Sequence, residues 1–353
     1  MEHMVKKYKV CLIGCGRMGA TIDDEVKDRP DAHLFLPYSH AAAIQAMEEA
    51  AFVGVSDVMA DKVETIRKRY GVERGYTDYR EMIEKEQPDV VCIATRPASH
   101  RELVVCAAER GVKGIYCEKP LCCSMEEADA MGEACDRYGV KFNYGTQRRY
   151  MDPYLRVREL IRAGEVGNVS AVVAACGVGS ALWSHTHAAD MVLFLADDAE
   201  IDYVQGAANV DPADFADNRV DGDPGIPMGY VRFKNGIHAY LTAGTGYEFE
   251  VSGSKGKLRT LNNGLAAQWR KVGAWNILEE VPFPEIRRAS GTVAGIRDVV
   301  QAMEAGRETQ GDIHLARRSQ EMIMGLVESE RLNGARVKFP MENRSLYIGK
   351  KDW

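Results

Sequence analysis

A glycine-rich pattern near the amino terminus constrains the fold of this chain more than any other feature. Residues 14–19 read Gly-Cys-Gly-Arg-Met-Gly and follow directly on the apolar run at residues 8–13. In such a G-x-G-x-x-G pattern the first glycine permits a tight turn, the second lets the backbone approach a pyrophosphate, and the third lets a helix pack closely on its strand. The pattern therefore predicts a strand, turn and helix that bind a dinucleotide, with its phosphates on amide N–H groups at the start of the helix. The predicted cofactor-binding residues here are Gly14, Gly16, Arg17, Met18 and Gly19.

Short apolar runs recur up to residue 145. They lie at residues 8–13, 51–55, 90–94, 114–117 and 141–144, and segments with helical periodicity, such as residues 61–70, 101–110 and 124–138, separate them. Unbroken apolar runs that alternate with helices indicate parallel strands covered on both faces. Residues 1–145 are therefore expected to form an α/β Rossmann domain with a doubly wound parallel sheet.

The sequence pattern changes after residue 145. Helical patterns at residues 153–163 and 183–195 flank a strand-like run at residues 169–176, and strand-like segments with turn signals fill residues 201–281. Two further helical patterns lie near residues 292–305 and 313–332, and we assign both of them to this part of the chain. Strands flanked by helices in this order are typical of an α+β domain. Residues 146–353 are therefore expected to form a second domain with a largely antiparallel sheet.

An acidic residue follows the second predicted strand. Asp57 at that position would hydrogen-bond the adenosine ribose and repel a 2′-phosphate, which favours NAD and leaves NADP possible. Asp57 lies farther from the glycines than the usual spacing of about 20 residues. Residues 21–39, rich in Asp, Pro and His, account for the excess as an apparent insertion. The other interpretation of Asp57 is a helix cap.

Charge and composition exclude several classes of partner. The net charge of −7 argues against a nucleic-acid or anionic-membrane partner, since both favour basic surfaces. No apolar run reaches the roughly 18 residues that a membrane-spanning helix needs, and residues 1–4 lack the apolar core of a signal peptide. Nine cysteines, several within apolar runs, suit free thiols in a reducing compartment better than disulfides. A cytoplasmic protein is expected.

A metal site is not expected. Cys117, Cys122 and Cys123 lie close together in the sequence but lack the second pair of ligands typical of a structural site. His185 and His187 could form a metal pair, but dehydrogenation with a nicotinamide needs no metal.

Two motifs make the chain similar to a known family. Residues 117–120 read Cys-Glu-Lys-Pro at the end of a predicted strand, and residues 187–190 read His-Ala-Ala-Asp. The turn at residues 94–100, the crossing at residues 143–150 and the strand turn at residues 251–258 agree with the same family. The chain resembles the glucose–fructose oxidoreductase and inositol dehydrogenase (Gfo/Idh/MocA) family over nearly its whole length.

The resemblance implies a Rossmann domain, an α+β domain with an open sheet, and hydride transfer at a hydroxyl of a sugar, polyol or related compound. Members usually associate through the open sheet, so a homodimer or homotetramer through the C-terminal sheet is expected. The resemblance also implies cofactor contacts from Thr95, His100 and Glu118, and a substrate contact from Arg148.

Oxidation of a secondary alcohol needs a general base near the hydroxyl and a cation that stabilises the developing alkoxide. His187 suits the first role, because the unperturbed pKa of histidine lies near working pH. Lys119, at the carboxyl end of a strand, suits the second, because open α/β sheets bind ligands there. Asp190 lies three residues after His187 on one helical face and could orient the imidazole or bind a substrate hydroxyl. We predict that these three residues are catalytic.

One position departs from the family pattern. Many members carry an acid four residues before the catalytic histidine, and here that position is Trp183. Either His187 lacks a carboxylate partner or another residue supplies one. An indole provides an apolar platform for a sugar ring, so Trp183 is predicted to contact the substrate.

These features predict an NAD(P)-dependent dehydrogenase that acts on a secondary hydroxyl of a small carbohydrate-like substrate. Two alternatives remain open. One is a redox-neutral glycosidase or lyase-like relative that retains NAD and uses transient oxidation, so that no net NADH forms. The other is a nucleotide-sensing protein without catalysis, for which substitution of Lys119 and His187 together would remove no activity.

Overall fold

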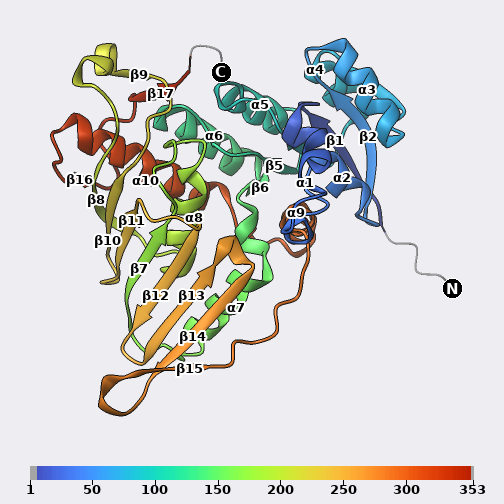
Figure 1. The fold of residues 1–353 in the computed structure, drawn as a ribbon. Coiled ribbons are helices and arrows are strands. Elements are labelled where there is room, and N and C mark those ends of the chain that lie inside the picture. The colour runs from blue at the N-terminus through green and yellow to red at the C-terminus, as the bar shows by residue number, and fades with distance from the viewer. Residues whose placement is uncertain (1–5, 351–353) are drawn as a thin grey trace. The chain divides into compact units, whose positions relative to one another are not determined.

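The computed structural model describes residues 6–350, which form two compact units (Figure 1). The first unit comprises Met1–Cys122, Glu127–Tyr150 and Ala289–Ala316, and the second comprises Cys123–Glu126, Met151–Arg288 and Arg317–Trp353. Residues 1–4, where the sequence lacks the core of a signal peptide, lie outside the described residues. Within residues 6–350, no helix combines the length and the apolar character that crossing a membrane requires.

The first unit contains a six-stranded parallel sheet with the strand order β3-β2-β1-β4-β5-β6. This order, which reverses between β1 and β4, is that of the dinucleotide-binding Rossmann fold. The prediction of a doubly wound parallel sheet is confirmed. The strands are β1 (Tyr8–Ile13), β2 (Ala50–Ser56), β3 (Arg74–Tyr76), β4 (Val90–Ile93), β5 (Gly114–Cys117) and β6 (Lys141–Tyr144).

Helices connect these strands. Ser39 caps the start of α2 by accepting a hydrogen bond from the backbone N–H of Ala42, and Gly71 ends α3 in the left-handed conformation that glycine adopts without strain. The connecting helices are α1 (Ile22–Val26), α2 (His40–Gln45), α3 (Ala60–Tyr70), α4 (Tyr79–Glu86), α5 (Pro97–Glu109) and α6 (Met125–Tyr138).

A helix from late in the chain, α9 (Gly291–Ala305), also belongs to the first unit. Its Ile296 and Val299 are fully buried in the same apolar cluster as Val10 and Val90 of the parallel sheet. The sequence-based boundary at residue 145 places this helix in the second domain, whereas the structure places it in the first unit. Helical periodicity shows that α9 has an apolar face but not which sheet that face covers.

The second unit contains a nine-stranded sheet with the order β15-β14-β13-β12-β7-β11-β10-β8-β16, in which β7 and β11 form the parallel pair. Buried and half-buried residues alternate along β10 and β13, as expected when one face packs on the core and the other faces outward. The expected open, largely antiparallel sheet is confirmed. Its strands are β7 (Val169–Ala175), β8 (Ile201–Ala207), β10 (Met228–Phe233), β11 (His238–Thr242), β12 (Glu248–Gly253), β13 (Gly256–Leu261), β14 (Ala266–Val272), β15 (Leu278–Val281) and β16 (Val337–Lys338).

The second unit also contains α-helices and a small parallel pair of strands, β9 (Arg219–Asp221) with β17 (Tyr347–Gly349). Helices α7 (Asp152–Arg162) and α8 (His185–Leu195) lie wholly within it, and α10 (Ile313–Arg331) belongs to it from Arg317 onward. Helix α8 packs on β7, and ten of its eleven residues are buried.

Candidate functional site

The glycine loop follows β1 at the carboxyl edge of the parallel sheet. Gly14 has a φ of +98°, and a Cβ there would lie 2.5 Å from the carbonyl oxygen of Ala94. A Cβ on Gly19 would lie 1.9 Å from the carbonyl oxygen of Gly14. Side chains at either position would therefore displace backbone, which explains why the loop needs glycine twice.

The middle glycine, Gly16, has a different surrounding. No atom of the described residues lies within 4 Å of the position that a Cβ would take there. A helical segment starts directly after it, with the N–H of Ala20 donating to the carbonyl oxygen of Gly16 at 2.9 Å, and Gly16 offers no side-chain cap. Bare backbone at a helix start, with open space above it, fits the pyrophosphate of a dinucleotide.

Asp57 lies beside this loop. One carboxylate oxygen accepts a hydrogen bond from the backbone N–H of Cys15 at 2.8 Å, and the other accepts from the N–H of Met59 at 3.0 Å. The carboxylate therefore braces the glycine loop and begins the turn before α3, whose N-cap residue is Met59 rather than Asp57. Burial, followed by the negative charge of Asp57, raises the pKa of the Cys15 thiol to about 12.

The other predicted loop contact, Arg17, is exposed and pairs with Glu25 of α1, with Nε 2.7 Å from the nearer carboxylate oxygen. Arg17 begins the helical segment Arg17–Thr21, and Met18 is its second residue. Arg17 thus lies next to the loop, but its guanidinium is engaged with an acid of the following helix.

Glu118 and Lys119 follow directly on β5 at the same edge of the sheet. The Glu118 carboxylate is buried and has two donors: Nε2 of His40 lies 3.0 Å from one oxygen, and the backbone N–H of Lys119 donates to the other at 3.1 Å. Lys119 itself is half-buried. The lysine therefore starts from a backbone that a buried acid holds in place.

Two predicted cofactor contacts lie near the end of β4. Thr95 is in the turn after this strand, and His100 is in the first turn of α5. The fully buried ring of His100 has its two nitrogens 3.2 Å from the carbonyl oxygens of Leu121 and Thr95, and burial lowers its pKa. The Thr95 hydroxyl lies 2.8 Å from that of Ser99. His100 thus connects the turn after β4 to the loop after Lys119. The side chain of Thr95 is half-buried.

Arg148 lies in a short helical turn after β6, in the first unit, and is 7% exposed. The neighbouring Gln147 accepts a hydrogen bond from the hydroxyl of Thr292 in α9 at 3.4 Å. The turn therefore packs against α9, a contact that the sequence did not predict.

The second unit carries the predicted base. His185, Thr186 and His187 form the first turn of α8, and Asp190 follows one turn later. His187 is half-buried, whereas Asp190 and His185 are each 1% exposed. Burial lowers the pKa of His185, so this second imidazole is held neutral.

Trp183, 40% exposed, lies just before α8. The backbone N–H groups of Leu182 and Trp183 donate to the two oxygens of Asp223, at 2.7 and 2.9 Å. Burial raises the pKa of Asp223. The sequence did not identify Asp223 as a site residue. It lies about 40 residues after Trp183 in an Asp-Gly-Asp-Pro segment, and such a segment predicts only a turn or loop.

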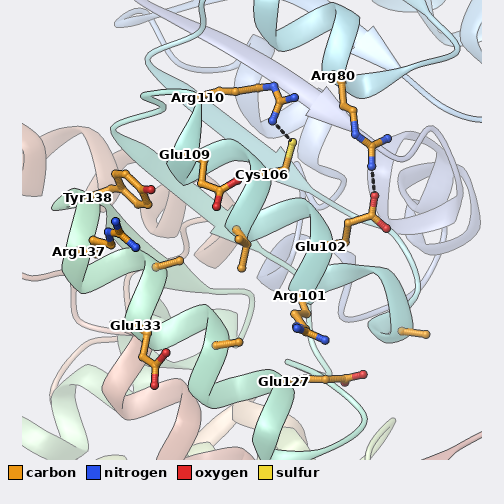
Figure 2. A pocket seen from close by; sticks show the side chains of 14 residues that line it. Arg80, Arg101, Glu102, Cys106, Glu109, Arg110, Glu127, Glu133, Arg137 and Tyr138 are labelled. Carbon is orange, nitrogen blue, oxygen red and sulfur yellow. Dashed lines mark hydrogen bonds and ion pairs between the residues drawn. The ribbon is translucent and has the colours of Figure 1, made fainter.

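Figure 2 shows a groove of about 740 Å³ on the helical flank of the first unit, between α5 and α6. Arginine and glutamate side chains line it, with Arg80 paired to Glu102. None of the predicted site residues lies in this groove. Within the described residues, no three His, Cys, Asp or Glu side chains gather as a metal ion would require.

Residues 8–146 match the model of an oxidoreductase family described as having an NAD-binding Rossmann fold. The chain is 32% identical over 163 residues to the D-apiose dehydrogenase of Paraburkholderia graminis, which is 46% of this chain and 38% of that protein. It is 30% identical over 128 residues to the myo-inositol 2-dehydrogenase of Thermotoga maritima, which is 36% of this chain and 38% of that protein. The matched part thus spans less than half the length of these relatives.

The fold has counterparts among solved structures. That of a levoglucosan dehydrogenase in complex with NADH superimposes with a TM-score of 0.75 and 20% identity, covering 95% of this chain and all of the other. Identity this low establishes the fold alone. The family match over residues 8–146 and the sequence matches support the family resemblance and confirm the NAD-binding Rossmann domain.

Proposed function

Because residues 8–146 match the model of the Gfo/Idh/MocA oxidoreductase family, we propose that this chain is an NAD-dependent dehydrogenase that oxidises a secondary hydroxyl of a sugar, glycoside or polyol. The observation that carries the proposal is the carboxyl edge of the parallel sheet. There the open backbone at Gly16, the Asp57 carboxylate that is bonded to the same loop and Lys119 after β5 lie along one edge. This edge is where open α/β sheets bind ligands.

The preference for NAD follows from Asp57. Its carboxylate is fixed by the N–H groups of Cys15 and Met59, so it cannot turn away from a ligand that lies on the loop. A free 2′-hydroxyl of the adenosine ribose can donate to it, whereas a 2′-phosphate would meet a fixed negative charge.

The protein's own groups divide the remaining work. Bound NAD would accept the hydride. The ammonium of Lys119 stabilises negative charge on the substrate oxygen, and the imidazole of His187 takes the hydroxyl proton, with Asp190 one turn farther along α8. Arg148 and Trp183 bind and orient the substrate. The names of the relatives describe dehydrogenases, which favours net oxidation over the redox-neutral alternative.

The test is a screen of sugars, glycosides and polyols for NADH formation by the purified protein. A stoichiometric yield of NADH from at least one of them supports the proposal. Cleavage of a glycoside without net NADH would favour the redox-neutral alternative, and NAD binding without turnover of any compound would favour a nucleotide sensor.

We also propose that two copies associate through the open face of the nine-stranded sheet. Tyr230 and Tyr240 are direct cross-strand partners there, the ring of Tyr203 lies tilted against that of Tyr230, and Tyr240 is 40% exposed. Tyr240→Glu should shift the molecular mass measured by light scattering toward the monomer, whereas Lys234→Glu, in the β10–β11 turn, should not. An unchanged molecular mass for Tyr240→Glu would show that this face of the sheet does not form the interface between copies.

A cytoplasmic location is part of the same proposal. All nine cysteines are free, and eight of them are buried. Buried thiols without disulfides suit a reducing compartment.

A further inference from the structure

A short turn between β7 and α8, in the second unit, carries Trp183. The backbone N–H groups of Ser184 and His185 both donate to the carbonyl oxygen of Ser180, at 3.1 and 3.0 Å. The chain therefore makes one helical turn before α8 begins, and we call residues 180–184 the entry turn. The entry turn sets the place from which the indole of Trp183 and the first turn of α8 start.

A carboxylate from a distant segment caps the entry turn. One oxygen of Asp223 accepts from the backbone N–H of Leu182 at 2.7 Å, and the other accepts from that of Trp183 at 2.9 Å. The first N–H groups of a helical turn find no partner within the turn, and an aspartate that accepts them acts as its N-cap. Here the cap comes from a residue 40 positions after Trp183 in the sequence.

The segment that carries Asp223 is itself fixed against the entry turn. Pro224 restricts the backbone of Asp223 to extended conformations, and its carbonyl oxygen accepts from the N–H of Ala181 at 2.7 Å. The N–H of Ile226 donates to the carbonyl oxygen of Gly179 at 3.0 Å. The carboxylate therefore starts from a backbone that is already paired with the turn it caps.

The charge of Asp223 and the entry turn stabilise each other. Asp223 is half-buried, and burial raises the pKa of its carboxyl group, whereas the N–H groups of Leu182 and Trp183 act in the opposite direction. A carboxylate without these donors would be a poorly compensated charge, and the turn would keep two N–H groups without an acceptor. Removal of either partner is thus expected to loosen the turn.

The entry turn presents apolar surface on this fixed backbone. Trp183 is 40% exposed, and Val178, just before the turn, is 49% exposed. Val178 lies against the Asp223 segment, since a Cβ on Gly225 would be 3.2 Å from its Cγ1. A sugar ring can pack on an indole through its C–H groups. A platform whose backbone is held in place before binding loses less freedom when the ring arrives, which favours affinity.

We propose that Asp223 is a positioning residue for substrate binding, whose carboxylate holds the entry turn so that the indole of Trp183 is presented to the sugar ring. The inference rests on the proposed function, in which Trp183 contacts the substrate. It assigns a role to a carboxylate that lies outside the motifs of the sequence.

The experiment compares Asp223→Asn and Asp223→Ala with Asp211→Asn. Asp211 is the matched control, because its carboxylate accepts from the backbone N–H of Ala213 at 2.9 Å in another turn of the second unit. Three quantities are measured for each variant: the Kd of NADH by its fluorescence, the Kd of the best sugar for the enzyme–NADH complex by calorimetry, and amide hydrogen exchange across residues 180–187. None of these readouts depends on turnover.

Amide exchange across residues 180–187 should be faster in both Asp223 variants, because the N–H groups of Leu182 and Trp183 lose an acceptor. In Asp223→Ala the sugar should bind the NADH complex roughly fivefold more weakly, a coupling typical of residues in contact. Asp223→Asn, which keeps one acceptor oxygen, should show a smaller change. The KM of the sugar should follow its Kd with little change in kcat, and the Kd of NADH should stay the same. Asp211→Asn should behave as wild type.

A double-mutant cycle with Trp183→Ala separates positioning from general stability. If Asp223 acts through the indole, Asp223→Ala should weaken sugar binding by less than about twofold when Trp183 is already alanine, because the group that it positions is gone. A purely structural role would give the same factor in both backgrounds, and that result would overturn the inference.

Two further results would overturn the inference and leave the dehydrogenase proposal standing. One is sugar binding by both Asp223 variants that equals that of an active wild type. The other is a parallel weakening of NADH binding in Asp223→Asn, which would show that the carboxylate supports the whole protein and not the substrate contact. A wild type that neither forms NADH nor binds any of the sugars would overturn the proposed function, and with it the role of Asp223.

Discussion

Nε2 of His40 lies 3.0 Å from Oε1 of Glu118, and both side chains are buried in the first unit. The imidazole ring also packs edge-on against Tyr116 of β5, with centroids 5.0 Å apart. The second oxygen of Glu118 accepts from the backbone N–H of Lys119. One buried carboxylate thus joins the first residue of α2 to the lysine that we place in catalysis.

Substitution of His40 should therefore lower the stability of the protein. His40→Ala leaves a buried carboxylate with one donor fewer, which should lower the free energy of unfolding by about 3 kcal/mol, measured by urea denaturation. His40→Gln, which keeps an N–H donor, should lose less. His33→Ala, at an exposed histidine of the same segment, is the control. Equal stability of His40→Ala and the wild type would show that the contact between His40 and Glu118 does not stabilise the fold.

Substitution of Asp57 should change the cofactor preference. We expect the wild type to favour NAD. In Asp57→Asn the ratio of kcat/KM with NAD to kcat/KM with NADP should fall at least tenfold, which corresponds to about 1.4 kcal/mol. The asparagine keeps one acceptor for the N–H groups of Cys15 and Met59, so the loop should persist. Asp61→Asn, in the first turn of α3, should leave the ratio unchanged. A wild type that prefers NADP would contradict the assignment.

Substitution of Lys119 should remove turnover but not cofactor binding. Lys119→Ala deletes a cation at the reacting hydroxyl, and such groups typically contribute about 10²–10⁴ in rate. The Kd of NADH should change little, because the pyrophosphate contacts lie at the glycine loop. Lys113→Ala, at an exposed lysine just before β5, should behave as wild type. Near-normal turnover by Lys119→Ala would exclude the lysine from the mechanism.

The pH profile should identify the base. If His187 accepts the proton, kcat/KM for oxidation should rise with pH through one ionisation, and His187→Asn should remove that rise. Because burial lowers the pKa of His185, a profile governed by His185 would rise below the usual histidine value of about 6.5. Trp183→Ala should raise the KM of the substrate without moving the profile, since an indole exchanges no proton. A profile that shifts in Trp183→Ala at constant KM would contradict this division of roles.

The regular parts of the fold could be predicted from the sequence because local pattern determines them. β1, β5 and β6 have the predicted bounds, since each is a short apolar run buried on both faces. β3 and α4 were not predicted. β3 has three residues at the edge of the sheet and only Tyr76 is buried, so its sequence carries no strand pattern.

Several polar contacts at the candidate sites could not be predicted, because they join residues far apart in the sequence. The polar composition of residues 21–39 indicated only an insertion, and nothing local shows that His40 would meet Glu118 or that Asp23 would accept from the backbone of Tyr38 and Ser39. Asp223 is a similar case, since its partners are backbone N–H groups near Trp183 that have no sequence signature. The roles of Lys119, His187 and Asp190 stay predictions.

The return of α9 to the parallel sheet has a consequence for how the protein is made. A ribosome that has synthesised residues 1–150 has produced all six strands of that sheet, but not the helix that buries Val10 and Val90. The apolar face would stay uncovered until residue 305 emerges, after Met151–Arg288 of the second unit. A gene fragment that ends after β6 should therefore yield an aggregating polypeptide, and fusing residues 289–316 to it through a flexible linker should restore solubility.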